Sequence, residues 1–237
     1  MPGLISAHTH LTGLIQRGLW DEPSFESWSQ KSAATEKILD LSPGDILLIH
    51  SAASIELIRH GVTTVLNMFT APTKGTLNCV NAACRAFADS GIRGILAFAL
   101  KDQSPDNSAL IQEHRQVEAW VEQARAACHQ VKSFGPRVSF ALAPSAPQRC
   151  SDRLLIACRE LAEKLDVGLH THLAETRKHA EVGRELYGEP IVHHLAKLGF
   201  LGPNLSVAHA IWIDDDEIDL LKRHDVEIGR ASCRERV

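Results

Sequence analysis

The sequence predicts an α/β protein, and specifically an incomplete (β/α)8 TIM-type barrel that contains strands one to six and at most the start of strand seven. Short, almost continuously apolar segments alternate with helical segments, which is typical of a parallel sheet buried on both faces. Histidines follow the first, fifth and sixth of these segments, and the ends of such distant strands converge at the mouth of a barrel. The length of 237 residues agrees with one barrel domain. An open doubly wound sheet would give the same alternation, but no G-x-G-x-x-G fingerprint follows the first strand.

The predicted strands are short runs of apolar residues bounded by polar or turn residues. They cover residues 4–7, 63–68, 93–100, 138–143, the stretch that begins at 168, and 205–211, and residues 226–228 begin a seventh strand. The segment 11–41 between the first strand and the next regular element is long, polar and aromatic, which is typical of a functional loop.

The predicted helices begin at residues that suit a helix N-terminus. Ser42-Pro43-Gly44-Asp45 combines a capping serine, a proline in the first turn and an acid, and Asp214–Glu217 places acids at the positive end of a later helix. We expect helices over residues 24–39, 43–60, 77–89, 107–132, 152–166, 177–187, 191–198 and 214–224.

The composition indicates a protein without nucleic-acid or membrane partners. A net charge of -4, with scattered Lys and Arg, offers no basic patch for nucleic acid. No apolar run approaches the ~18 residues that span a bilayer, and the N-terminus does not resemble a signal peptide. The six cysteines form no C-x-x-C pair, which is typical of reduced thiols. We therefore expect a cytoplasmic protein.

The stretch Gly168–Glu175, G-L-H-T-H-L-A-E, carries the first chemical signal. The strand period of two places His170 and His172 on the same face, and Glu175 can approach them as the strand ends. An imidazole ligand beside a carboxylate is half of a metal-assisted hydrolase site. A second pair, His8 and His10, follows the first strand with the same spacing.

Three motifs together resemble the amidohydrolase superfamily. They are P-G-L-I-S-A-H-T-H at residues 2–10, H-T-H-L-A-E-T at 170–176 and S-V-A-H-A at 206–210. The resemblance is closest to the cytosine deaminase-like branch, with its methylthioadenosine/S-adenosylhomocysteine deaminases and triazine hydrolases. It extends from residue 2 to about residue 227, and the motifs occur in the order and on the strands that this superfamily has.

The resemblance implies one divalent metal, zinc first and iron as the alternative, held by His8, His10 and His172. It also implies that Glu175 transfers a proton to the leaving side of the substrate and that His209 orients the attacking water. Neutral imidazoles are suitable zinc ligands, and a bound metal lowers the pKa of water toward ~7. We assign His170 to packing or support of the ligands. The other histidines, including His50 and the adjacent pair at 193–194, are expected to be surface or satisfied core residues.

The resemblance implies hydrolytic deamination, or dechlorination, at a C=N carbon of a nitrogen heterocycle by a metal-bound hydroxide. The partner would be a small heterocyclic substrate, for which Trp20, Ser145 and Gln148 are the candidate contacts. Ser145 stands where nucleoside-deaminating relatives usually carry a histidine, so the sequence leaves the heterocycle open. Alternatives are another amidohydrolase acting on cyclic amides or amino-acid derivatives, and an inactive fragment. The sequence also leaves the oligomeric state open.

Two features depart from the superfamily pattern. The aspartate that usually ends strand eight, as metal ligand and base, has no counterpart here, and neither half of the usual β-sandwich is present. Residues 228–237, I-G-R-A-S-C-R-E-R-V, abandon the apolar pattern of a strand and resemble one reading frame of a sequencing adapter. We therefore expect a partial metal-dependent hydrolase barrel over residues 1–227, a non-native tail over 228–237, and an inactive truncated chain.

Overall fold

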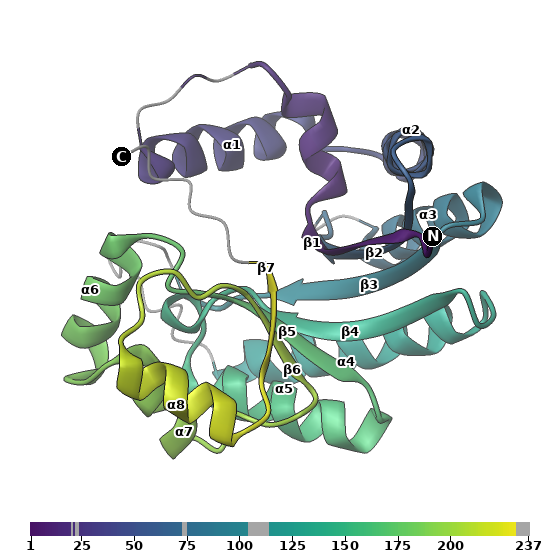
Figure 1. Cartoon of the computed structure of the whole chain (residues 1–237). Helices are drawn as coiled ribbons and strands as arrows, with labels where there is room; N and C mark the ends of the chain where they lie inside the picture. The colour runs from purple at the N-terminus through teal and green to yellow at the C-terminus, as the bar shows by residue number, and fades with distance from the viewer. Residues whose placement is uncertain (20, 22–23, 73–74, 104–113, 231–237) are drawn as a thin grey trace. The chain divides into compact units, whose positions relative to one another are not determined.

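Seven strands form one sheet whose spatial order is the order of the chain, β1 to β7 (Figure 1). The structure is a computed structural model that describes residues 1–19, 21, 24–72, 75–103 and 114–230. The strands are β1 (Leu4–Thr9), β2 (Val62–Phe69), β3 (Arg93–Leu100), β4 (Val138–Pro144), β5 (Gly168–Leu173), β6 (Leu205–His209) and β7 (Glu227–Arg230). The pairs β1–β2, β2–β3, β4–β5, β5–β6 and β6–β7 are parallel. A doubly wound sheet reverses its strand order, whereas this order never reverses, so the barrel alternative is the correct one.

Helices separate the strands, as the alternation in the sequence predicts. The α-helices are α1 (Phe25–Leu39), α2 (Pro43–Arg59), α3 (Thr76–Ser90), α4 (His114–Lys132), α5 (Asp152–Leu165), α6 (Arg177–Tyr187), α7 (Ile191–Lys197) and α8 (Asp215–Arg223). Two 3₁₀ helices, η1 (Leu11–Gln16) and η2 (Pro147–Arg149), were not predicted, because one or two short turns leave no periodic pattern. Residues 107–113 of the predicted fourth long helix lie outside the described residues.

Both predicted helix starts are capping boxes. The Ser42 side chain accepts the Asp45 N–H and the Asp45 carboxylate accepts the Ser42 N–H, which satisfies two donors at the start of α2. Asp214 and Glu217 exchange the same pair of bonds at α8. The buried Glu217 also accepts the Val192 N–H at 3.1 Å and so ties α8 to α7.

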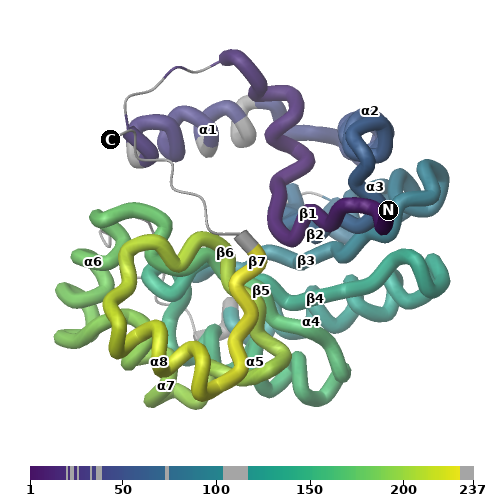
Figure 2. Tube along the Cα trace, in the orientation of Figure 1, coloured from purple at the N-terminus to yellow at the C-terminus, as the bar shows by residue number. Residues whose placement is uncertain are grey.

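The chain forms two compact units, each described here by itself. In the unit made of Met1–Phe98 and Ala126–Phe140, α2 lies beside α3 (Figure 2) and also contacts β2 and η1. In the unit made of Ala99–Arg125 and Ala141–Arg234, β5, β6 and β7 pair in parallel, with a register shift between β6 and β7, and α6 contacts both η2 and α7. Each unit therefore contains its own apolar core and one group of the residues that the motifs singled out.

The predicted sixth strand is too long. The sequence predicts it to residue 211, but β6 ends at His209, because His209 and Ala210 have φ angles of 78° and 51°. Residues with positive φ cannot continue an extended strand. β7, in contrast, extends to Arg230, so the first three residues of the expected tail are in a strand, and residues 231–237 lie outside the described residues.

Five cysteines, at positions 79, 84, 128, 150 and 158, are buried free thiols, and the sixth, Cys233, is not among the described residues. Burial raises the pKa of the Cys84 thiol to about 12, which keeps it protonated. In the described part of the chain, no helix has the length and apolar character needed to cross a bilayer.

His50 lies in α2 and is fully buried, with its ring against Phe69 and Phe87. Burial lowers the pKa of this imidazole from 6.5 to about 4, because an apolar surrounding disfavours the charged ring. Above pH 6.5 the folded and unfolded chains both hold neutral His50. Below that pH, the unfolded chain binds a proton that the folded chain does not.

We expect the free energy of unfolding to fall between pH 6.5 and pH 4 by roughly 3 kcal/mol through this histidine alone. Urea unfolding of the wild type and of His50→Gln at several pH values between 7 and 4 isolates this contribution, because all other titrating groups are shared. The wild type should lose stability more steeply than the variant. Equal pH slopes would show that His50 titrates normally.

Candidate functional site

His8 and His10 come from the carboxyl end of β1, as the motif predicts. Their rings lie edge to face with centroids 5.0 Å apart, which confirms that the two side chains share one face of the strand. His8 is 4% exposed and His10 is half-buried. The pair is therefore placed to offer two ring nitrogens to one side of β1.

A backbone carbonyl fixes the tautomer of His10. Nδ1 of His10 lies 3.0 Å from the Met68 carbonyl oxygen of β2. A carbonyl only accepts, so Nδ1 of the neutral ring donates its hydrogen and the lone pair lies on Nε2. Such a bond from the second ring nitrogen orients a metal-binding histidine and raises its basicity.

His172 on β5 has the same arrangement in the other unit. Its Nδ1 lies 2.6 Å from the Ser145 carbonyl oxygen, and its backbone N–H donates to that same oxygen at 3.2 Å. The neutral ring therefore also presents Nε2 as its ligand atom. Ser145, a predicted substrate contact, lies just after β4 and is nearly buried, and its backbone oxygen positions the predicted ligand.

His170 does not share this arrangement. It is completely buried, and its Nδ1 hydrogen-bonds to the Ser206 hydroxyl of β6 at 2.8 Å. Ser206 in turn donates to the Leu169 carbonyl at 3.3 Å, and His170 pairs with Ser206 in the sheet register. The ring thus links two neighbouring strands, which agrees with a supporting assignment.

Glu175 and His209 form a buried pair. The His209 Nε2 and Glu175 Oε1 atoms are 3.6 Å apart, and both side chains are about 95% buried. The His209 ring also stacks on His172, with centroids 5.7 Å apart and an interplanar angle of 10°. A buried carboxylate beside an imidazole is the pair of groups that proton transfer needs.

Arg149, at the end of η2, was not predicted. Burial lowers the pKa of its guanidinium, and the negative charge of Glu175 opposes that shift. A partly buried cation benefits from such a partner, because desolvation without one is costly. Arg149 lies in no recognisable motif. The one signal in the sequence is that a basic residue follows a predicted apolar strand.

The backbone is strained where these residues gather. Ala174 after β5, and His209 and Ala210 at the end of β6, have φ angles of 42°, 78° and 51°. A non-glycine residue with positive φ costs of order 1–3 kcal/mol, and such strain concentrates at functional sites. The N–H of Ala210 donates to the Leu173 carbonyl at 2.7 Å, which holds the two strand ends together.

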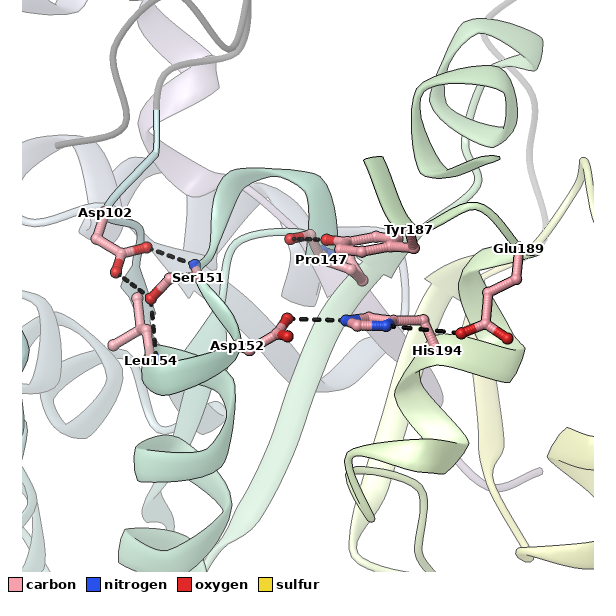
Figure 3. Close-up of polar contacts among 8 residues, drawn as sticks. All are labelled: Asp102, Pro147, Ser151, Asp152, Leu154, Tyr187, Glu189 and His194. Atoms are coloured by element: carbon pink, nitrogen blue, oxygen red, sulfur yellow. Dashed lines mark hydrogen bonds and ion pairs between the residues drawn. The ribbon is translucent and has the colours of Figure 1, made fainter. Parts of the chain in front are cut away.

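Polar contacts hold η2 against its neighbours (Figure 3). The Tyr187 hydroxyl donates to the Pro147 carbonyl at 3.0 Å, and the Tyr187 ring stacks on His194, which contacts Asp152 at 2.8 Å. The Asp102 carboxylate accepts the N–H and hydroxyl of Ser151 just beyond η2. Tyr187, Asp102 and His194 had no assigned part in the predicted site, because their partners are distant in the chain.

Gln148 in η2 has an unusual position for a polar side chain. It is 4% exposed, and its carbonyl oxygen Oε1 has no hydrogen-bond partner among the residues that the structure describes. A buried acceptor without a donor costs about 1–3 kcal/mol, so it favours a ligand that supplies an N–H or O–H group. The third predicted substrate contact, Trp20, lies outside the described residues.

The donor chemistry fits a divalent metal with imidazole ligands. Zinc binds neutral histidines, and the carbonyl bonds of His10 and His172 select the neutral tautomer with a lone pair on Nε2. In the described part of the chain, the imidazole donors suited to this role are His8 and His10 in one unit and His172 in the other.

Comparison with known proteins gives a consistent result. A model of the Amidohydrolase family matches residues 1–236. The 5-methylthioadenosine/S-adenosylhomocysteine deaminase of Symbiobacterium thermophilum is 30% identical over 235 residues, an alignment covering 98% of this chain and 49% of that protein. The chain therefore spans about half the length of the curated relatives it matches.

Two solved structures with zinc share the fold. The atrazine chlorohydrolase of Arthrobacter aurescens TC1 complexed with zinc has a TM-score of 0.83 at 24% identity, over 96% of this chain and 52% of that one. The adenosine deaminase of Xanthomonas campestris with bound zinc has a TM-score of 0.82 at 24% identity, over 96% and 48%. These similarities confirm the predicted barrel fold.

The strained end of β6 gives a direct stability prediction. Glycine adopts positive φ without the Cβ penalty, so Ala210→Gly should raise the free energy of unfolding by about 1 kcal/mol. Ala208→Gly, two residues earlier in the extended strand, is the matched control and should lower it, because glycine weakens a strand interior and removes a buried methyl group. Urea unfolding curves measure both, and a destabilised Ala210→Gly would contradict the assignment of strain.

Proposed function

Because the chain belongs to the amidohydrolase family, whose members are enzymes, we propose that it is part of a metal-dependent hydrolase acting on nitrogen heterocycles. The reaction is hydrolytic removal of an amino group, or of chloride, from a C=N carbon. The observation that carries the proposal is the pair of carbonyl-fixed tautomers at His10 and His172, since both prepare a neutral imidazole to bind a metal.

His8, His10 and His172 are the proposed ligands of one divalent metal, with zinc preferred and iron as the alternative. Imidazole nitrogens suit both metals, and two solved structures of the same fold contain zinc. When bound, the metal would supply Lewis acidity that makes water available as a nucleophile near neutral pH.

Glu175 and His209 are the proposed proton-handling residues. The Glu175 carboxylate would take a proton and deliver it to the leaving nitrogen, because ammonia leaves more readily than an amide anion. His209, with Nε2 3.6 Å from Glu175 Oε1, would orient the attacking water and the carbonyl-like oxygen that forms. Arg149 would keep Glu175 from being an isolated buried charge.

Gln148 and Ser145 are the proposed substrate contacts near η2, with Trp20 as the further candidate from the sequence. The Gln148 Oε1 acceptor would bind a ring N–H or an exocyclic amino group, which heterocyclic amines provide. We propose a small heterocyclic substrate, a soluble cytoplasmic protein, and no role with nucleic acid or membranes. The oligomeric state is left open.

Two alternative functions are also proposed, each for a specific reason. An amidohydrolase acting on cyclic amides or amino-acid derivatives would use the same histidines. An inactive metal-binding chain is the second, because no residue of this sequence corresponds to the usual strand-eight aspartate. The tail assignment for residues 228–237 stays a proposal as well.

The metal assignment is tested by exchanging one histidine at a time on β5. His172→Asn should lower the zinc affinity by at least 100-fold, because it removes a ligand. His170→Asn is the comparison variant two residues away, whose wild-type bond goes to Ser206, and as a supporting residue it should lower the affinity by only about tenfold. Zinc per chain after desalting, and competition with a chromogenic chelator, measure both. Equal affinities in the two variants would remove His172 from the ligand set.

The reaction is tested by ammonia and chloride release from a panel of aminopurines, aminopyrimidines and chlorotriazines. Release with a zinc-loaded chain supports the proposed reaction, and Gln148→Met should then raise KM about tenfold with unchanged zinc content. Zinc binding without release from the panel, but with hydrolysis of cyclic amides, favours the first alternative. Zinc binding with no turnover at all favours the inactive chain.

A further inference from the structure

We propose that His50 and Asn67 are positioning residues for the metal ligand His10. They form a buried chain of hydrogen bonds that runs from α2 through β2 to the backbone that follows His10. The inference rests on the proposed metal site and adds two residues that no motif assigned to it. The whole chain of bonds lies within one compact unit.

The first link fixes the tautomer of His50. Its Nδ1 lies 3.0 Å from the Ile46 carbonyl oxygen, one helical turn earlier in α2. Because the carbonyl accepts, Nδ1 donates the hydrogen, and Nε2 is left as an acceptor. The burial that lowers the pKa of His50 to about 4 keeps the ring neutral at physiological pH.

The second link fixes the orientation of the Asn67 amide. Nδ2 of Asn67 lies 3.0 Å from His50 Nε2. Because that nitrogen accepts, the amide must present its NH₂ group to the ring and its oxygen to the opposite side. There, Oδ1 accepts the Leu11 N–H at 3.0 Å. The opposite amide orientation would place a donor against the Leu11 N–H and an acceptor against His50 Nε2.

The third link reaches the ligand. Asn67 and Met68 are consecutive residues of β2, and they hold His10 from two directions. The Met68 carbonyl accepts from the His10 ring, and the Asn67 side chain accepts from the next backbone N–H. Asn67 also pairs with Thr9 in the sheet register. The backbone on both sides of His10, together with its ring nitrogen, is therefore set by β2.

Because these hydrogen bonds are buried, the loss of any one of them affects the structure around it. His50 and Asn67 are at most 1% exposed, and Leu11 is buried as well. The rings of Phe69 and Phe87 pack against His50, and hydrogen bonds in such an apolar environment are stronger than in water. A metal ligand must be held within about 0.5 Å of its productive position, and removal of one link would release the segment that carries it.

The test is cobalt(II) binding to the 237-residue chain, read by affinity and by the d–d absorption spectrum. Asn67→Leu should lower the affinity at least tenfold and shift the spectrum, because the His10 segment relaxes. His50→Leu should act in the same direction. His50→Gln retains an acceptor for Asn67 Nδ2 and should restore affinity to within about threefold.

Ser54→Ala is the matched control. Ser54 lies one turn beyond His50 in α2, is completely buried, and its hydroxyl has no hydrogen-bond partner in the described part of the chain. Its loss should change neither the affinity nor the spectrum. Melting temperatures of all variants separate positioning from a purely structural role, which would lower stability and leave cobalt binding unchanged.

The outcomes are distinct. Wild-type affinity and spectrum in Asn67→Leu and His50→Leu would overturn the positioning inference alone. Absence of cobalt binding in the wild type would overturn the proposed metal site, and the inference with it. If Asn67→Leu fails to fold, the comparison of His50→Leu with His50→Gln decides, since equal affinities in that pair contradict the proposal.

Discussion

A bond from an imidazole Nδ1 to a backbone carbonyl organises both groups of residues that we propose as metal ligands. Met68 supplies the carbonyl for His10, Ser145 supplies it for His172, and Ile46 supplies it for the buried His50. A carbonyl has no hydrogen to give, so it permits one neutral tautomer only. Each ring then presents Nε2 as an acceptor or ligand atom, and the rest of the site chemistry depends on that choice.

The second feature is the concentration of unfavourable conformations and charges at the ends of β5 and β6. Ala174, His209 and Ala210 have left-handed backbones, and Glu175 is buried beside Arg149 and His209. Cores normally avoid such arrangements, and proteins keep them where a site needs particular side chains at fixed positions. The strained strand ends turn the chain sharply after His172 and at His209, which agrees with functional demands on these two segments.

The sequence predicted the strand order and nearly every helix, because parallel buried strands and capped helices leave periodic signals in short windows. The predicted cap at Ser42 was correct to the residue, and the acids predicted at the start of the last helix lie there, with Asp214 as its cap. The predicted end of β6 was wrong, because nothing in the local pattern of apolar residues indicates the positive φ of His209. The carbonyl partners, the Asn67 bridge and the Arg149–Glu175 interaction were also missed, since each joins positions that are far apart in the chain or carry no motif. The ligand and catalytic assignments themselves stay predictions.

One consequence follows from the bond between His172 and residue 145. The acceptor is a main-chain atom, so a substitution at position 145 changes the side chain and leaves the oxygen in place. Ser145 can therefore diverge among related enzymes without disturbing the histidine that it orients. Selection for a new heterocycle and selection for a working metal site would then act on separate atoms of the same residue. Such a separation gives a barrel of this type a way to change its chemistry in small, individually tolerated steps.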